Sequence, residues 1–130
     1  MLYLDSSALV KLIVNEPESA ALNRWLAGQP NLVRVSSTMI RAEVPRAAWR
    51  ADPAALADSY RVIRQIVEVE LSDEVLGRAA GVRPPALRAY DAVHLASALT
   101  LRRELTAFVA YDRRLLAAAR DAGLPVASPA

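Results

Sequence analysis

The first eleven residues, MLYLDSSALVK (residues 1–11), predict a strand, a charged turn and the start of a helix, in that order. Residues 2–4 are a short apolar run that stops at Asp5, and residues 6–14 form an apolar, helix-like segment. A short strand followed directly by a helix is typical of the β–α–β units that join parallel strands.

The same alternation of short apolar runs and longer helix-like segments continues to the end of the chain. Further strands are predicted at residues 32–35, 67–71, 107–111 and 124–127. Further helices are predicted up to residue 27, at 37–50 and 53–66, after residue 72, and at 91–104 and 112–121. Strands separated by helices need crossover connections, which place them in a parallel sheet covered on both faces. We therefore expect an α/β fold, a three-layer α/β/α sandwich with about five mostly parallel strands, formed by residues 1–130 as one domain.

The composition excludes several kinds of active site. The 130 residues include no cysteine, which removes disulfides, zinc ribbons, iron–sulfur clusters and a thiol nucleophile. A single histidine, His94, excludes a multi-histidine metal site, and in an apolar helix it is expected to be a hydrogen-bonded core residue. Any bound metal must therefore be held mainly by carboxylate oxygens, which favours Mg²⁺ or Mn²⁺.

Charge and hydropathy point to a cytoplasmic protein without a membrane partner. The N-terminus has no basic segment, Asp5 interrupts the first apolar run, and no apolar run approaches the roughly 20 residues of a membrane span. The 16 Lys and Arg residues against 14 Asp and Glu residues give a formal charge of +2. All of these cations except Lys11 are arginines. This near-neutral balance argues against a basic coat but permits a local basic groove.

Four acidic residues occupy positions where ligands bind in parallel sheets. Asp5 and Asp112 follow the first and fourth predicted strands, Asp91 begins the most apolar helix, and Glu43 lies beside the apolar face of another helix. Ligands of open parallel sheets bind at the carboxyl ends of the strands. Four carboxylates packed together would repel one another and raise their pKa values unless a divalent cation balanced them. The set therefore predicts a metal site.

Each of these residues also has a structural interpretation when it is taken alone. An aspartate directly before a helix caps it, which explains Asp5, Asp91 and Asp112 one at a time. Glu43 could instead pair with Arg46 or Arg50 along its own helix. Two further candidates, each as well explained by capping, are the hydroxyl groups beside the first aspartate, Ser6 and Ser7.

Four segments of the chain resemble the motifs of PIN-domain proteins, and specifically the VapC toxins of bacterial and archaeal toxin–antitoxin modules. The opening residues 1–11 are similar to their first motif, and RAEVPR (41–46) is similar to their internal glutamate motif. YDAVHLASA (90–98) and FVAYDRRL (108–115) resemble the third and fourth. The four motifs occur in order and cover nearly the whole chain.

The resemblance implies a Mg²⁺- or Mn²⁺-dependent endoribonuclease that hydrolyses RNA phosphodiester bonds with metal-activated water. It implies that Asp5, Glu43, Asp91 and Asp112 form the acidic metal site, supported by a hydroxyl group at Ser6 or Ser7. It also implies a homodimer that a VapB-type antitoxin neutralises, with operator DNA bound only through the antitoxin.

The residue types add expectations about the reaction and its substrate. No side chain is a competent covalent nucleophile, so water should attack, and in-line displacement should leave a 5′-phosphate and a 3′-hydroxyl. Arg46, Arg113 and Arg114 lie near the acids in sequence and could bind RNA phosphates in a bidentate manner. Alternatively, each of these arginines simply lies on a helix face that is exposed to solvent.

Two alternatives to a nuclease remain at this point. One is a non-catalytic interaction domain with the same fold, which the intact acids disfavour. The other is a receiver-like phosphoacceptor domain, which needs an acidic pair after the first strand, an acceptor aspartate after the third and a lysine after the fifth. Here Asp5 is followed by Ser6, the third strand ends at Leu71 and Ser72, and the only lysine is Lys11.

Overall fold

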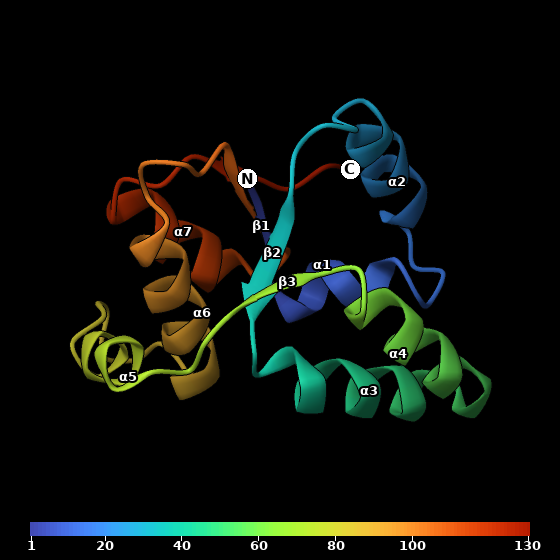
Figure 1. Cartoon of the computed structure of the whole chain (residues 1–130), viewed down its shortest axis with the longest axis horizontal. Coiled ribbons are helices and arrows are strands. Elements are labelled where there is room, and N and C mark those ends of the chain that lie inside the picture. The colour runs from blue at the N-terminus through green and yellow to red at the C-terminus, as the bar shows by residue number, and fades with distance from the viewer.

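The computed structural model describes residues 1–130 and contains one sheet of five strands in the order β3-β2-β1-β4-β5 (Figure 1). The strands are β1 (Leu2–Leu4), β2 (Arg34–Ser37), β3 (Val67–Val69), β4 (Ala107–Val109) and β5 (Val126–Ala127). All neighbouring strands are parallel. The chain starts at the centre, fills one half of the sheet, and then crosses to the other half. The strand order changes direction between β1 and β4, and such a switch point is where open α/β sheets bind ligands.

Helices cover both faces of the sheet, which confirms the predicted α/β/α sandwich. The helices are α1 (Ser6–Lys11), α2 (Ser19–Ala27), α3 (Ile40–Ala51), α4 (Leu56–Ile63), α5 (Asp73–Ala80), α6 (Ala89–Thr100) and α7 (Arg113–Asp121), with a 3₁₀ turn at Pro53–Ala55. Figure 1 shows α1 to α4 on one side of the sheet and α5 to α7 on the other. Receiver domains instead have the strand order 2-1-3-4-5, so the receiver-like alternative is wrong.

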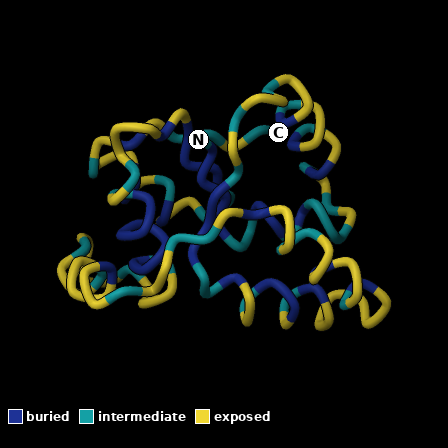
Figure 2. The backbone as a smooth tube through the Cα atoms, viewed as in Figure 1, coloured by how far each residue is buried: buried dark blue, intermediate teal, exposed yellow.

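The central strand β1 divides the core into its two halves. Successive side chains of a strand point to opposite faces. Leu2 and Leu4 accordingly pack against α1, α2 and α3, whereas Tyr3 packs against α6 and α7. The Tyr3 ring stacks on Phe108 of β4, with 5.3 Å between the ring centroids. All three β1 side chains are fully buried, and Figure 2 shows the buried backbone concentrated in the middle of the molecule.

The second strand begins two residues later than its apolar pattern predicts. The N–H group of Leu32 donates to the carbonyl oxygen of Gln29 at 3.2 Å, which keeps this segment in a turn. The strand therefore runs from Arg34 to Ser37, whose hydroxyl oxygen accepts from the N–H group of Met39 at 3.2 Å. That contact turns the chain from β2 into α3.

The bounds of four predicted helices also differ from the sequence expectation. The helix expected at 37–50 begins at Ile40, because Ser37 belongs to β2. The helix expected at 6–14 ends at Lys11, and the one expected at 53–66 divides into a 3₁₀ turn and α4. The helix expected at 91–104 begins at Ala89, so Asp91 lies in its first turn and does not cap it. Helix ends depend on tertiary contacts as well as on the local sequence, which is why the pattern alone misplaces them.

No helix in the structure is both long and apolar enough to span a membrane.

Candidate active site

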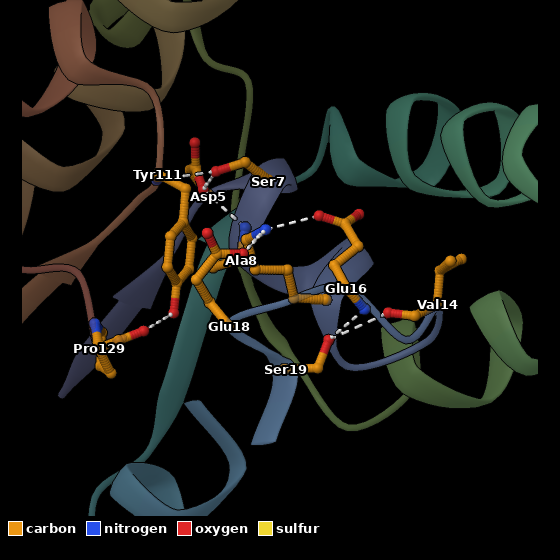
Figure 3. Close-up of polar contacts among 10 residues, drawn as sticks. Asp5, Ser7, Ala8, Val14, Glu16, Glu18, Ser19, Tyr111 and Pro129 are labelled. Carbon is orange, nitrogen blue, oxygen red and sulfur yellow. Dashed lines mark hydrogen bonds and ion pairs between the residues drawn. The ribbon is translucent and has the colours of Figure 1, made fainter. Parts of the chain in front are cut away.

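The carboxyl ends of β1 and β4 are joined by hydrogen bonds at the switch point of the sheet. The Ser7 hydroxyl donates to Oδ1 of Asp5 at 2.6 Å and accepts from the N–H group of Tyr111 at 3.0 Å (Figure 3). Tyr111 immediately precedes Asp112. Ser7 therefore links Asp5 to the residue that precedes Asp112.

Asp5 is buried and also caps α1. Its Oδ1 accepts from the N–H group of Ala8 at 2.9 Å, which confirms the capping interpretation. Only 3% of the residue is exposed. Burial raises the pKa of Asp5 to about 6, with nearby Asp91 adding to the rise and His94 and Ser7 opposing it. Capping alone does not explain a buried carboxylate, because asparagine caps a helix about as well.

Glu43 is bonded to the buried histidine. Oε2 of Glu43 lies 2.7 Å from Nε2 of His94, and Nδ1 of His94 lies 2.8 Å from the Tyr3 hydroxyl. The expected ion pair between Glu43 and Arg46 or Arg50 does not form, whereas the expectation that His94 is a hydrogen-bonded core residue is confirmed. These contacts connect three elements, namely β1, α6 and α3.

The hydrogen-bond directions in this chain of three residues follow from their chemistry. A carboxylate only accepts, so we assign the proton on Nε2 of His94 as the donor to Glu43. Nδ1 of a neutral imidazole then accepts from the Tyr3 hydroxyl. Burial raises the pKa of Tyr3, which keeps that hydroxyl protonated and able to donate. His94 therefore holds the Glu43 carboxylate from inside the core.

Arg88 lies between the other two acids. Its Nε donates to Oδ2 of Asp91 at 3.1 Å, and its Nη2 is 3.7 Å from Oδ2 of Asp112. Asp112 also caps α7 through the N–H group of Leu115 at 2.9 Å, as predicted. The Arg88 side chain is 74% exposed and can move away without disturbing the core.

Two neighbouring cavities open beside these acids. The larger, about 450 Å³, lies between α3 and the start of α6 and is lined by Glu43 and Asp91 together with Ser6. The smaller, about 250 Å³, is lined by Ser6, Ser7 and Glu43 among others. Glu43 and Ser6 therefore face both spaces.

The arginines are distributed differently from the sequence expectation. Arg46 lines the larger cavity, whereas Arg113 and Arg114 are exposed on α7 and line neither space. Arg50 and Arg88 line the cavity instead. The position of Arg88 just before Asp91 was a usable signal. The sequence offers Arg50 only as a partner of Glu43, because its approach to α6 depends on tertiary structure.

Lys11, the only lysine of the chain, packs against Tyr111, the residue before Asp112. Nζ of Lys11 is 2.5 Å from Glu16 and 2.8 Å from Glu18, and lies 4.6 Å from the centroid of the Tyr111 ring. Burial favours the neutral amine, but the bonds to the two glutamates outweigh it and raise the pKa of Lys11. The hydroxyl of Tyr111 donates to the carbonyl oxygen of Pro129 at 2.7 Å (Figure 3). Tyr111, and with it the loop before Asp112, is therefore held from two sides.

The donor chemistry fits a hard divalent cation. Carboxylate and hydroxyl oxygens are the only side-chain ligands that the two strand ends offer, and a cationic group already lies between Asp91 and Asp112. As the side chains are arranged, no three acidic or histidine residues are close enough to share one cation. Glu43 is turned toward His94, and Asp91 toward Arg88. Binding of a cation by Asp91 and Asp112 would therefore require the exposed Arg88 side chain to move away.

Replacing Arg88 should strengthen cation binding. Arg88→Gln removes the guanidinium group that competes for Asp91 and Asp112. An exposed ion pair contributes about 0.2–1 kcal/mol, so we expect Mn²⁺ to bind up to about fivefold more tightly. The amount of free Mn²⁺ in a titration followed by electron paramagnetic resonance measures this. Arg78→Gln removes a comparable ion pair on α5 and serves as the control. An unchanged or weaker affinity for Arg88→Gln would show that the guanidinium does not compete.

Comparison with known proteins identifies the family. The PIN domain family model matches residues 2–121. Ribonuclease VapC47 of Mycobacterium tuberculosis is 39% identical over 132 residues, which cover 99% of this chain and 97% of that protein. Ribonuclease VapC46 of the same species is 41% identical over 128 residues, covering 98% of this chain and 97% of that protein.

A solved structure shares the fold. The crystal structure of Mycobacterium tuberculosis VapC20, described as a toxin that cleaves the sarcin–ricin loop, matches with a TM-score of 0.77 at 19% identity. The match covers 99% of this chain and 100% of that one. The sheet order, the acids at the switch point and these full-length matches lead to one assignment. This chain belongs to the PIN-domain family and, within it, to the VapC ribonucleases.

Proposed function

We propose that this chain is the toxin of a VapB–VapC pair and acts in the cytoplasm as a metal-dependent endoribonuclease, with residues 1–130 forming a single nuclease domain. The observation that carries the proposal is the set of acids at the switch point. Asp5, Glu43, Asp91 and Asp112 come from four separate parts of the chain. Glu43 and Asp91 line the larger cavity, the charge of Asp91 acts on the buried Asp5, and Arg88 lies between Asp91 and Asp112.

The acids and their neighbours have distinct roles in this proposal. Asp5, Glu43 and Asp91 would hold Mg²⁺ or Mn²⁺, with Asp112 as a further ligand. Once bound, the cation lowers the pKa of a water molecule and stabilises charge on the scissile phosphate. Water would attack phosphorus in line with the P–O3′ bond, which breaks and leaves a 5′-phosphate and a 3′-hydroxyl.

The remaining polar residues of the site either orient these acids or face the substrate. Ser7 fixes the Asp5 carboxylate through its 2.6 Å hydrogen bond, and His94 fixes Glu43 at 2.7 Å. Ser6 lines both cavities and is placed to contact substrate or water. Arg46 faces the larger cavity, where it can hold an RNA phosphate.

The partners proposed here follow from the family. A VapB-type antitoxin covers the acidic site with its C-terminal segment and binds operator DNA through its own N-terminal domain. The toxin itself is a homodimer and contacts DNA only through the antitoxin. RNA is the substrate.

The function is tested by cleavage of total cellular RNA with the purified chain. We expect discrete new RNA ends in Mg²⁺ or Mn²⁺, loss of cleavage in EDTA, and recovery when the cation is restored. Sequencing libraries that require a 5′-phosphate should capture the new ends. Cleavage that persists in EDTA would contradict the metal-dependent mechanism. Intact RNA in both cations, with normal Mn²⁺ binding, would contradict the nuclease assignment.

A further inference from the structure

The larger cavity contains cationic and aromatic groups that the acidic site does not need. Arg46 and Arg50 of α3 line it, and so does Tyr90, which lies next to Asp91 at the start of α6. Glu43 and Asp91 line the same space. The cavity therefore joins the acids to a cationic and aromatic rim.

The two α3 arginines are unpaired. Arg46 and Arg50 are four residues apart, so they lie on the same face of the helix, and like charges at this spacing destabilise a helix. Neither forms an ion pair or a side-chain hydrogen bond, in contrast to Arg41, Arg61, Arg78 and Arg88. An anion bound between Arg46 and Arg50 would remove this repulsion. RNA phosphates have the charge and the acceptor geometry to do so.

Tyr90 presents an aromatic ring to solvent beside these charges. The residue is 65% exposed, the most exposed of the large hydrophobic side chains. An exposed ring next to arginines is a common platform for an unpaired base, because every base has a face that can stack. A base inside a duplex cannot stack on such a ring unless it first unpairs and unstacks from its neighbours.

We propose that this cavity is the subsite for one unpaired RNA nucleotide adjacent to the scissile phosphate. Its base stacks on Tyr90, and its flanking phosphates bind Arg46 and Arg50. The volume of about 450 Å³ falls in the range of pockets that hold small ligands, which suits one nucleotide. The proposal rests on the proposed ribonuclease function and adds to it the three residues, Tyr90, Arg46 and Arg50, that recognise the nucleotide.

Electrostatic repulsion by the acids determines how the nucleotide is oriented. Glu43 and Asp91 repel phosphate, so the flanking phosphates are held on the arginine side of the cavity. Only the scissile phosphate would approach the carboxylates, where a bound cation would offset their charge. The stacked base thus fixes the register of the strand relative to Asp5, Glu43 and Asp91.

Binding measured in EDTA separates this subsite from catalysis. The probe is a short 5′-fluorescein-labelled single-stranded RNA of mixed sequence, followed by fluorescence anisotropy, with the same RNA in a duplex as comparison. Tyr90→Ala should weaken binding of the single strand about five- to a hundredfold and leave duplex binding unchanged. Tyr90→Phe should retain the wild-type affinity, because the ring is preserved.

Matched substitutions control for surface effects. Tyr60→Ala removes another exposed aromatic ring, 49% exposed on α4 and outside this cavity, and should change neither affinity. Arg46→Gln and Arg50→Gln should each weaken binding and lower the slope of log Kd against log salt by about 0.7. Arg24→Gln, an exposed cation on α2 outside the cavity, should leave the salt slope closer to the wild-type value.

The possible results separate the subsite from the proposed function. Wild-type affinity in Tyr90→Ala, or an equal loss for single strand and duplex, overturns the subsite, whether or not the wild-type chain cleaves RNA. A selective loss in Tyr90→Ala supports it, even if the wild-type chain fails to cleave RNA in Mg²⁺. In that second case the ribonuclease assignment fails and the RNA-binding site stands.

Discussion

Asp5→Asn is expected to lose RNA cleavage by at least about a hundredfold while the protein keeps its fold. Substituting even a residue that supports a metal ligand costs about 10- to 100-fold in metal affinity or activity, and a ligand itself should cost more. Asparagine retains the acceptor oxygen for Ala8 and Ser7, and it caps a helix about as well as aspartate. Asp5→Asn therefore removes only the negative charge of the side chain.

The same substitution should leave stability in EDTA unchanged or higher at neutral pH. The pKa of Asp5 rises from 3.8 to about 6 on folding, which corresponds to about 3 kcal/mol. Because its pKa is raised in the folded state, the Asp5 carboxyl group stabilises the fold fully below about pH 4. This stabilisation is lost as the pH rises through about 6. At pH 7.5 the buried charge opposes folding, and asparagine removes it. The new amide group needs a hydrogen-bond partner of its own, so the gain in stability is smaller than about 3 kcal/mol.

Three measurements decide this prediction. RNA cleavage in Mg²⁺ gives the activity, circular dichroism gives the fold, and urea unfolding in EDTA at pH 5 and pH 7.5 gives the stability. Asp52→Asn, which substitutes an exposed cap at the 3₁₀ turn, is the matched control and should retain full activity. Cleavage by Asp5→Asn at the wild-type rate would refute the metal-site interpretation. The wild-type protein should lose stability between the two pH values, and Asp5→Asn should lose less.

The position of the site could be predicted from the sequence because it depends on strand order. A polar residue at the end of a short apolar strand lies at the sheet edge, whichever helices cover the faces. Asp5 and Asp112 accordingly lie at neighbouring strand ends, which the alternation of elements alone predicts. The apolar pattern places the start of the helix that contains Asp91 two residues too late, because α6 begins at Ala89 and Asp91 lies in its first turn.

The contacts that fix the site could not be predicted in this way. The hydrogen bonds of His94 join residues that are 51 and 91 positions apart, and no local pattern specifies such a pair. Arg113 and Arg114 directly follow Asp112 in the sequence, and only this nearness makes them candidates for RNA binding. A helix turns its side chains by about 100° per residue, so neighbours of a cap do not share its direction. Tyr90 was not selected, because an exposed aromatic residue next to an acid has no distinctive pattern.

His94→Ala is expected to destabilise the protein by about 3 kcal/mol and to weaken Mn²⁺ binding about tenfold or more. The substitution removes a fully buried ring and leaves both the Tyr3 hydroxyl and the Glu43 carboxylate without their partner. Removal of a large core side chain and loss of partners for buried polar groups each cost a few kcal/mol. The weaker binding follows because outer hydrogen bonds orient metal ligands.

Two milder variants separate core packing from the positioning of Glu43. Tyr3→Phe removes only the hydroxyl that bonds Nδ1, so it should cost about 1–2 kcal/mol and affect Mn²⁺ binding less than His94→Ala does. His94→Gln provides one acceptor and one donor at similar reach and should restore part of the Mn²⁺ affinity. Urea unfolding in EDTA measures the first effect, and Mn²⁺ titration of the folded proteins measures the second.

A double-mutant cycle tests whether His94 acts on the cation through Glu43. Substitutions at residues in contact do not have additive effects when one works through the other. In a Glu43→Gln background, His94→Ala should change Mn²⁺ affinity far less than it does in the wild type. If the two losses are additive, His94 does not act through Glu43, and its hydrogen bond to that carboxylate is only a feature of core packing. A folded His94→Ala with wild-type Mn²⁺ affinity would lead to the same conclusion.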